Sequence, residues 1–493
     1  MKKARRGAWA LLILTLLLAL FLGGCKDNAY GLSPKDPESL IVWHYYNGAQ
    51  KAMFDQMVTL FNETVGAEKG IAIEAFSQGA VDEVSAHVMD AIRQNVGASS
   101  VPDIFAAYAD AAYDVNQAGM LAEIGQYLTP KEREAYVPAY IEEGSFYSDK
   151  LYIMPVAKST EVLILNETDY DAFQAATGVS DAALETWEGL AQTAQAYYAW
   201  TDAQTSVPDD GKAFFGRDAM ANHLIIGSLQ LGAELLPVEN GVVKPNLNRA
   251  ALRRIWDTYY VPYISGYYAS IGRFRSDDAK TGDIIALVGS TSGASYFPRN
   301  VTRPDGTTYP ITAKVLPLPN FEGTTPYAVQ QGAGMAVTKS TPKREYAATV
   351  FLKWFTQPEQ NLRFCVGSGY LPVQAKANRR EAIDAQIDSL NALDTPITPL
   401  MVDVLHVGVD TVMTSHLYTG RAFEGGTQAR DVVNSTLQDR AQEDRAGVLA
   451  QMAQGMSHAD AVALYNTDAR FDDWVAVFSN ALTATIEDAA KGA

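Results

Sequence analysis

Three short apolar segments alternate with amphipathic segments near the beginning of the chain, and this alternation restricts the fold more than any other feature. The apolar segments, at residues 40–44, 71–76 and 102–108, have the length of buried strands. The segments that follow them carry apolar residues every three to four positions, as amphipathic helices do. Such alternation predicts βαβ units and a largely parallel sheet. Because ligand sites in these sheets lie at the carboxyl ends of the strands, we expect one in the loops at residues 44–48, 77–80 and 108–110.

The remainder of the chain is long enough for a second unit of the same kind. Helical patterns dominate residues 181–260 and 343–493, and further strands are expected at residues 151–156, 162–166, 284–288, 313–316 and 334–337. The 468 residues after Cys25 are too many for one hydrophobic core, so the sequence predicts two lobes.

The first 25 residues have the pattern of a secretory signal. An apolar run at residues 8–22 follows four basic residues, Lys2, Lys3, Arg5 and Arg6. The run is short for a membrane span of roughly 20 apolar residues. It ends in Leu-Gly-Gly-Cys at residues 22–25, which resembles the bacterial lipobox, in which the cysteine is lipidated and becomes the first mature residue. We therefore expect a signal peptide at residues 1–24, lipidation of Cys25 and a polar tether up to residue 38. An uncleaved anchor is the alternative, and it also places the body outside the cytoplasmic membrane.

The charge and the cysteine content exclude several partners. The formal charge of −18 becomes −22 once the four basic residues of the leader are removed, and this field repels nucleic acid and anionic lipid headgroups. The cysteines and histidines show no metal-site spacing, so we expect neither a metal site nor a cofactor. Cys365 is expected to be unpaired once Cys25 carries lipid.

Five motifs occur in the order typical of extracellular solute-binding family 1, the substrate-binding receptors of ABC importers, and the chain resembles that family from about residue 39 to 440. The motifs are Pro155–Leu163 with Asn166, Thr186–Leu190, Leu316–Pro319, Gly332–Val337 and Phe351–Glu359. Ser-Gly-Tyr-Leu-Pro-Val at residues 368–373 resembles the branch that binds glycerol-3-phosphate and sugars.

The resemblance implies a two-lobed α/β fold of the type II periplasmic-binding-protein class, with central, mostly parallel sheets flanked by helices and a ligand cleft between the lobes. Crossovers are expected near residues 155–159, 289–292 and 338–342. The first lobe would then combine residues 39–157 with 290–340, and the second lobe residues 158–289 with 341–493.

The resemblance also implies a function. Such a protein captures a sugar, a polyol or a glycerol-phosphate-like solute and delivers it to a permease in the membrane. The permease is a separate polypeptide, because this sequence has neither membrane spans nor a Walker motif. We expect a monomer that a lipid, such as palmitate, anchors to the extracytoplasmic face of the membrane, and we expect no enzymatic activity.

The candidate ligand contacts lie at strand ends and crossovers. Each also has a structural interpretation, such as a helix cap, a turn that ends a strand or a tight crossover. Side-chain hydroxyls, phenols and carboxylates there suit sugar or phosphate oxygens, and glycines let the backbone approach a ligand. The candidates are His44, Tyr45, Tyr108, Asp110, Ser159, Thr160, Ser290, Ser292, Gly332 and Gly334.

Further candidates come from the glycerol-3-phosphate branch. Tyr370 matches a ligand-contacting tyrosine of that branch, and Arg421 matches an arginine that can bind phosphate, although a surface position for Arg421 stays open. The tryptophan that the branch usually presents early in the second lobe is absent. Phe215 and Arg217 stand in that region instead, and they can supply a stacking face and a charge, or Arg217 can pair with Asp218.

Three other functions compete with this interpretation. A hydrolase is disfavoured because Gly-Ser-Thr-Ser-Gly at residues 289–293 puts threonine where a nucleophile elbow needs serine, and because the paired carboxylates lie in polar segments. A ferric-ion receptor would use the tyrosines of residues 259–268, which can equally pack a lobe. A structural lipoprotein would have no closing cleft.

Overall fold

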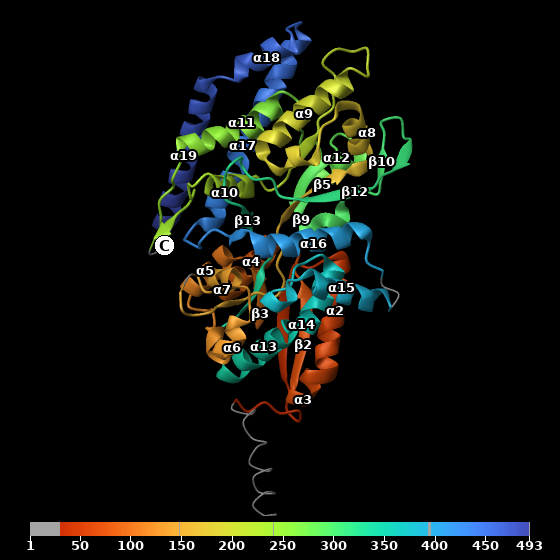
Figure 1. The fold of residues 1–493 in the computed structure, drawn as a ribbon. Coiled ribbons are helices and arrows are strands. Elements are labelled where there is room, and N and C mark those ends of the chain that lie inside the picture. The colour runs from red at the N-terminus through yellow and green to blue at the C-terminus, as the bar shows by residue number, and fades with distance from the viewer. Residues whose placement is uncertain (1–29, 147, 240, 393–395, 493) are drawn as a thin grey trace, which may run out of the picture.

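The structure is a computed structural model that describes residues 30–146, 148–239, 241–392 and 396–492. Figure 1 shows two lobes stacked one above the other. The expected signal peptide and Cys25 lie outside the described residues. Across these ranges, no helix combines the length and the apolar character needed to cross a bilayer.

The first lobe is built on a five-stranded sheet of order β2-β1-β3-β14-β4. Strands β1, β2 and β3 are parallel, as predicted, and β14 runs antiparallel to β3 and β4. Leu40 and Val42 face one core, and Trp43 faces another. Both faces of the sheet are therefore covered, as parallel strands require. The strands are β1 (Glu38–His44), β2 (Ile71–Ser77), β3 (Ile104–Ala107), β4 (Ile153–Met154) and β14 (Gly334–Val337).

Helices from two separate parts of the chain cover this sheet. The helices from its first part are α2 (Gly48–Phe61), α3 (Ala67–Lys69), α4 (Val81–Ile92), α5 (Ala109–Gln117), α6 (Pro130–Glu134) and α7 (Pro138–Gly144). The later ones are α13 (Pro342–Phe355), α14 (Pro358–Ser368) and α15 (Arg380–Asn391).

The second lobe is built on a four-stranded sheet of order β12-β5-β9-β6. Only β6 and β9 are parallel, whereas β5 is antiparallel to both β9 and β12. This differs from the mostly parallel sheet that we expected, because β5 leads away from the first lobe and β9 leads back toward it. The strands are β5 (Glu161–Asn166), β6 (Phe215–Arg217), β9 (Ala286–Ser290) and β12 (Ala313–Pro317).

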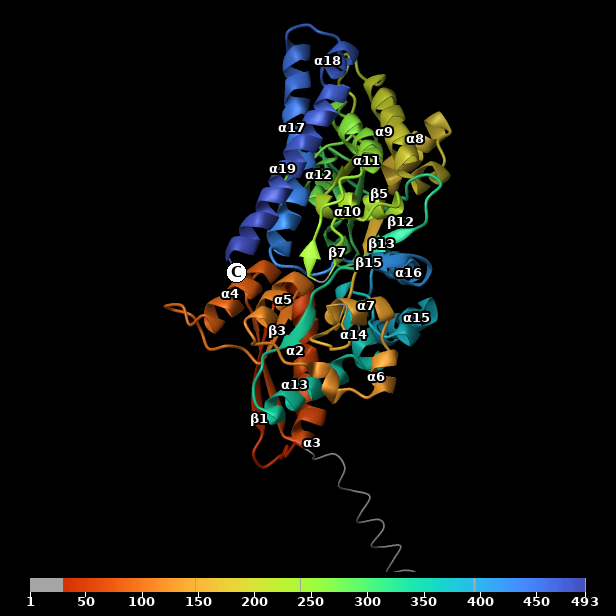
Figure 2. The same cartoon turned by 90° about the vertical axis from the view of Figure 1, so that its left-hand side faces the viewer.

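The helices of the second lobe include a C-terminal hairpin. Helix α17 packs against α10, α11, α18 and α19, and Figure 2 shows α17 and α19 along one side of this lobe. The helices are α8 (Glu167–Thr177), α9 (Trp187–Asp202), α10 (Met220–Gln230), α11 (Arg249–Ile264), α12 (Arg275–Thr281), α17 (Gly426–Ala453), α18 (His458–Tyr465) and α19 (Asp468–Gly492). Three short strand pairs complete the fold: β7 (Val238–Glu239) with β8 (Val242–Val243), β10 (Asn300–Thr302) with β11 (Thr308–Pro310), and β13 (Tyr327–Val329) with β15 (His416–Tyr418).

The hydrophobic cores divide the chain differently from the ranges that we expected. Residues 290–321 remain with the second lobe because β12 extends its sheet. Residues 342–390 belong to the first lobe because α13, α14 and α15 contribute to its core. Helix α16 (Pro399–Thr414) lies at the junction, with Leu405 and Val409 in the first core and Val404 in a core of the second lobe. The described core residues begin at Leu32, so residues 30–493 carry both lobes.

The chain passes between the lobes at three places. The first, at Lys158–Thr160, is where we expected it, and the others lie near residues 330–333 and 415–425 rather than at 289–292 and 338–342. The first two run side by side, because Ser159 pairs with Gln331 through backbone hydrogen bonds in both directions.

Replacing Gly332 with alanine is expected to lower the unfolding free energy by about 1–3 kcal/mol. Gly332 has φ of +91°, and a Cβ there would lie 2.7 Å from the carbonyl oxygen of Ala157. Urea denaturation measures the effect, and Gly420→Ala is the control, since a Cβ at Gly420 meets no described atom within 4 Å. Equal stabilities for the two variants would contradict this account of the crossover.

Candidate ligand site between the lobes

Aromatic side chains from the ends of the first sheet lie next to the crossovers. Tyr45 follows β1, and its hydroxyl lies 3.0 Å from the hydroxyl of Tyr370. Burial raises the pKa of both phenols, so they stay neutral hydrogen-bonding groups. Tyr108 follows β3 and is 43% exposed. Tyr45 and Tyr370, two of the residues predicted from the sequence, are therefore in contact, and a ligand-binding role for them and for Tyr108 stays a prediction.

The facing surface of the second lobe carries a chain of four polar side chains. Glu161, at the start of β5, forms an ion pair with Arg217 at the end of β6, and both are almost fully buried. Asn222, in the first turn of α10, donates to the second oxygen of Glu161 at 2.7 Å. Its own amide oxygen accepts from Arg430 of α17 at 2.5 Å. These contacts join four elements, β5, β6, α10 and α17, at one end of the sheet.

A second buried ion pair holds the crossover. The ammonium of Lys158 donates to Glu143 Oε2 at 2.5 Å and to the carbonyl oxygen of Gly332 at 2.9 Å. The amide of Gln330 donates to the same carboxylate oxygen at 2.8 Å. Lys158 is 2% exposed, so solvent does not compensate its charge.

Several buried polar atoms in this region have no hydrogen-bond partner among the described residues, and we call them unpartnered atoms. A buried polar group without a partner costs about 1–3 kcal/mol, and native proteins contain few of them. A cluster of such atoms therefore marks a place where a ligand or water supplies the missing hydrogen bonds. The unpartnered atoms here are Arg217 Nε and Nη1, Asp110 Oδ1, Thr160 Oγ1, Thr291 Oγ1, Gln330 Oε1 and Gln331 Oε1.

Asp110 connects the first lobe to the beginning of α17. A Cβ at Gly426 would lie 2.5 Å from Asp110 Oδ1, so only glycine leaves room for this carboxylate. Burial raises the pKa of Asp110 to about 7, although the attraction of Arg430 and a hydrogen bond from the backbone of Phe423 oppose the shift. Asp114 and Glu143 add to the increase.

The folded protein is expected to lose stability as the pH rises from about 4 to about 7, because Asp110 binds a proton more tightly when folded. One such group changes the unfolding free energy by at most about 1.4 kcal/mol per pH unit. Urea denaturation of wild type and Asp110→Asn at pH 5 and pH 8 measures this, and the variant is expected to lose less stability between the two pH values. The same loss in both proteins would contradict the assignment.

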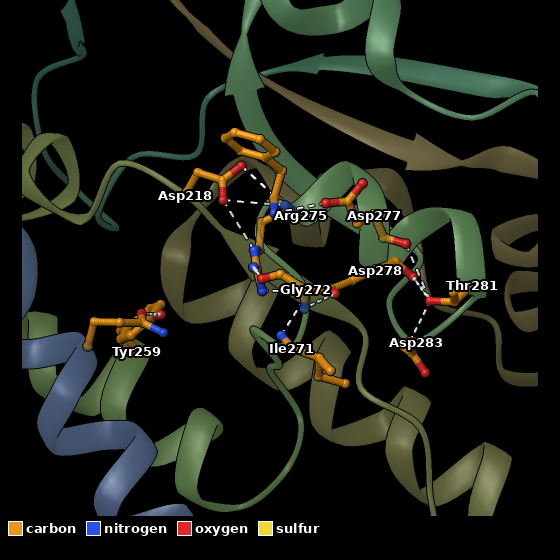
Figure 3. A network of polar contacts seen from close by, with 11 residues as sticks. Asp218, Tyr259, Ile271, Gly272, Arg275, Asp277, Asp278, Thr281 and Asp283 are labelled. Carbon is orange, nitrogen blue, oxygen red and sulfur yellow. Dashed lines mark hydrogen bonds and ion pairs between the residues drawn. The ribbon is translucent and has the colours of Figure 1, made fainter. Parts of the chain in front are cut away.

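A buried network of ion pairs supports the edge strand β6, which ends at Arg217. Arg275 donates to Asp278 at 2.5 Å and to Asp218, the residue after Arg217 (Figure 3). Asp278 also accepts from the backbone of Ile271 and Gly272. Asp218 therefore pairs with Arg275, not with Arg217 as one alternative held, and Arg217 remains directed to Glu161.

We call the chain Glu161–Arg217–Asn222–Arg430, the pair Lys158–Glu143 and the residues with unpartnered atoms the polar cluster. Other predicted residues lie outside it. His44 is fully buried and accepts from the backbone of Tyr46, and burial lowers its pKa to about 4. Phe215 is buried against Tyr268 in the core of the second lobe. A Cβ at Gly334 would overlap β4, as one at Gly332 would overlap the first crossover, so both glycines have a packing role. Arg421 is exposed and donates to the carbonyl oxygen of Val238.

The predicted serines lie at the crossover and beside it. Ser159 is buried in the backbone pairing of the crossovers. Ser290 and Ser292 form a mutual hydrogen bond of 3.0 Å. Gln50 of the first lobe donates to the carbonyl oxygen of Ser292 at 3.2 Å. This loop therefore touches both lobes.

The members of the polar cluster that the sequence analysis did not predict include Lys158, Glu161, Asn222 and Arg430. Lys158 and Glu161 flank Ser159 and Thr160 in the motif of the first crossover. In that motif only the two residues with hydroxyl groups were predicted as ligand contacts. Arg430 follows Arg421, the arginine predicted from the sequence, by nine positions. No sequence signal distinguishes Asn222 from other polar helix residues.

Neither a metal site nor a surface hollow in the described part of the chain competes with the polar cluster as the candidate ligand site. Among the residues described, no three histidine, cysteine or acidic side chains gather closely enough to hold an ion. The tyrosines of the ferric-ion alternative lie in the second core, where burial raises the pKa of Tyr268 well above its usual value and disfavours a phenolate ligand. Two hollows, of about 460 and 260 Å³, are lined by residues outside the cluster, such as Arg299 and His87.

Comparisons with known proteins identify the class. A family model described as bacterial extracellular solute-binding protein matches residues 56–391, and the chain belongs to this family. This confirms the resemblance and implies a location outside the cytoplasm. No curated protein is significantly similar to the chain in sequence.

Solved structures confirm the two-lobed fold. The cyclic alpha-maltosyl-1,6-maltose binding protein from Arthrobacter globiformis has a TM-score of 0.65 at 17% identity, over 92% of this chain and 100% of that chain. The GacH receptor of Streptomyces glaucescens, solved with acarbose, has a TM-score of 0.63 at 13% identity, with coverages of 92% and 99%. UgpB from Mycobacterium tuberculosis, solved with glycerophosphocholine, has a TM-score of 0.62 at 16% identity, with coverages of 90% and 99%.

Proposed function

We propose that this protein is the lipid-anchored receptor of an ABC importer and that it captures an uncharged, hydroxyl-rich solute of the sugar or polyol type between its lobes. The observation that carries the proposal is the combination of paired charges and unpartnered atoms in the polar cluster. The charges compensate one another, and what remains available is a set of hydrogen-bond donors and acceptors.

The charge balance favours a neutral solute. Lys158 is paired with Glu143, Arg217 with Glu161, and Arg430 lies in the field of Asp110. A phosphate would add about two negative charges next to two buried cations that already have carboxylate partners, inside a chain that is strongly acidic overall. Arg421, the cation expected to bind phosphate, lies on the surface.

The remaining groups suit hydroxyl oxygens. Arg217 offers N–H donors, Thr160 offers a hydroxyl, and Gln330 and Gln331 offer carbonyl oxygens. Tyr108 adds an exposed ring against which the apolar face of a sugar can pack. Two of the similar structures are described with oligosaccharides or acarbose, which supports this class, and the glycerophosphocholine of the third keeps a phosphodiester in the test.

The mechanism rests on contacts between the two lobes. Gln50 of the first lobe donates to the Ser292 loop, and Asp110 lies against the beginning of α17. A solute that contacts both lobes favours the closed form by its higher affinity for that form. The permease then recognises the closed receptor. The protein acts by binding, without chemical change of the solute.

The lipid anchor rests on the lipobox at residues 22–25. Cys25 carries the lipid in this proposal, and the polar residues up to 38 act as the tether. Labelling of cells with a palmitate analogue tests it: the wild-type protein is expected to incorporate label, and Cys25→Ala is not.

A thermal-shift screen of residues 30–493 tests the solute class. The panel contains glucose, maltose, maltotriose, glycerol-3-phosphate, glycerophosphocholine and ferric ion. A ligand that binds only the folded protein raises the unfolding temperature by mass action. We expect a shift with one or more of the saccharides and none with glycerol-3-phosphate or iron. A shift only with the phosphoesters would move the ligand to that class, and a response to iron alone would favour the ferric-ion receptor.

A further inference from the structure

Next to Arg217, the second lobe contains a group of polar side chains that carry buried hydrogen-bonding atoms without a partner among the described residues. Arg217 and His223 are each 2% exposed, and Tyr268 is 3% exposed. The unpartnered atoms are Arg217 Nε and Nη1, both ring nitrogens of His223, the hydroxyl of Tyr268 and the amide nitrogen of Gln438.

These side chains form one contiguous group. The guanidinium of Arg217 lies 5.5 Å from the ring of Trp187, and the centre of that ring lies 4.7 Å from the imidazole of His223. The imidazole lies 5.6 Å from Tyr259, whose ring lies 5.9 Å from Tyr268. Tyr259 in turn donates its hydroxyl to Gln438 of α17. The group therefore extends inward from the ligand cleft, between β6, α10, α11 and α17.

Leaving these atoms without hydrogen bonds would cost the folded protein too much free energy. Six unpartnered atoms at about 1–3 kcal/mol each would consume a stability that is typically about 5–15 kcal/mol in total. Some occupant must therefore supply hydrogen bonds. Arg217 and Gln438 can only donate through these nitrogens, so the occupant must offer acceptor oxygens.

We propose that Arg217, His223, Tyr268 and Gln438 line an inner subsite of the second lobe, which takes a hydroxyl-bearing end of the solute. This inference rests on the proposed function and extends the site from Arg217 of the polar cluster to His223, Tyr268 and Gln438. Burial and the neighbouring Arg217 lower the pKa of His223 well below its usual value. The neutral imidazole offers one donor and one acceptor, which is the complement of a hydroxyl group.

Tyr268→Phe tests the inner subsite with a minimal change. The substitution removes only a hydroxyl that has no partner in the described part of the chain, so we expect folding to be unaffected. The dissociation constant for maltotriose is expected to rise about 3–10-fold in calorimetric titration, the effect of one lost hydrogen bond. Tyr170→Phe is the control, because Tyr170 is a buried tyrosine that packs on Phe173 and Phe214 in the same lobe. This control is expected to bind as the wild type does.

A measurement on the wild-type protein gives a second, independent readout. Maltotriose is expected to shift the imidazole nitrogen resonances of His223, identified by their loss in His223→Gln. The resonances of His458, whose Nε2 hydrogen-bonds the carbonyl oxygen of Ser265, should not move. The inner subsite would be overturned if Tyr268→Phe binds maltotriose with unchanged affinity and the imidazole resonances of His223 do not shift. This result would show that only water fills it. In that result wild-type binding survives, so the proposed function stands. If the wild type binds no saccharide of the panel, both proposals fail.

Discussion

Replacing Lys158 with methionine is expected to lower the unfolding free energy by about 3–5 kcal/mol. The substitution leaves Glu143 buried without its counter-ion, because Lys158 and Glu143 are both less than a tenth exposed and lie 2.5 Å apart. It also removes the ammonium that holds the carbonyl oxygen of Gly332 in the neighbouring crossover. Urea denaturation followed by circular dichroism measures the loss.

The double variant Lys158→Met/Glu143→Gln is the matched control. A glutamine keeps an oxygen that can accept from Gln330 but carries no charge. A buried ion pair replaced on both sides costs far less than one that is broken, so we expect the double variant to recover most of the lost stability. If both variants lose the same amount, the loss comes from packing and the electrostatic account is wrong.

Replacing Arg217 with methionine is expected to weaken saccharide binding about 100-fold or more, since hydrogen bonds from a charged donor contribute about 1.5–3 kcal/mol each. Two of its nitrogens are unpartnered atoms, and the third donates to Glu161. The variant should also be less stable, because Glu161 keeps only the hydrogen bond from Asn222.

A second substitution separates the two effects. In Arg217→Met/Glu161→Gln the buried charge is gone, and the glutamine oxygen still accepts from Asn222. We expect the stability to return to within about 1–2 kcal/mol of wild type while binding remains lost. Binding that returns together with stability would show that Arg217 acts only on the fold.

The sequence was a good guide to the elements and a weaker guide to their grouping. The strands at 40–44, 71–76 and 334–337 form as predicted, because their hydrophobic patterns depend on local burial. Patterns cannot tell to which sheet a strand belongs. The segment at 313–316 was expected with the first lobe, yet it pairs with β5 of the second. Helix α13 was expected with the second lobe, but it packs on β1 and β14 of the first.

The prediction of the site from the sequence has the same limitation as the prediction of the lobes. Tyr45 and Tyr370 are 325 positions apart, and strand-end reasoning together with the family motif still placed them in one region. The chain Arg217, Glu161, Asn222 and Arg430 was not predicted as a unit, because each contact joins elements more than 50 residues apart. Such contacts depend on the packing of α10 and α17 against the sheet, which no local pattern encodes.

Calorimetric titration of residues 30–493 with glucose, maltose and maltotriose tests the central claim most directly. We expect saturable binding of at least one of these saccharides at one site per chain in the wild type and no binding in Arg217→Met/Glu161→Gln. The absence of wild-type binding to all three, or equal binding by the double variant, would contradict a neutral-solute site built on the Glu161–Arg217 pair.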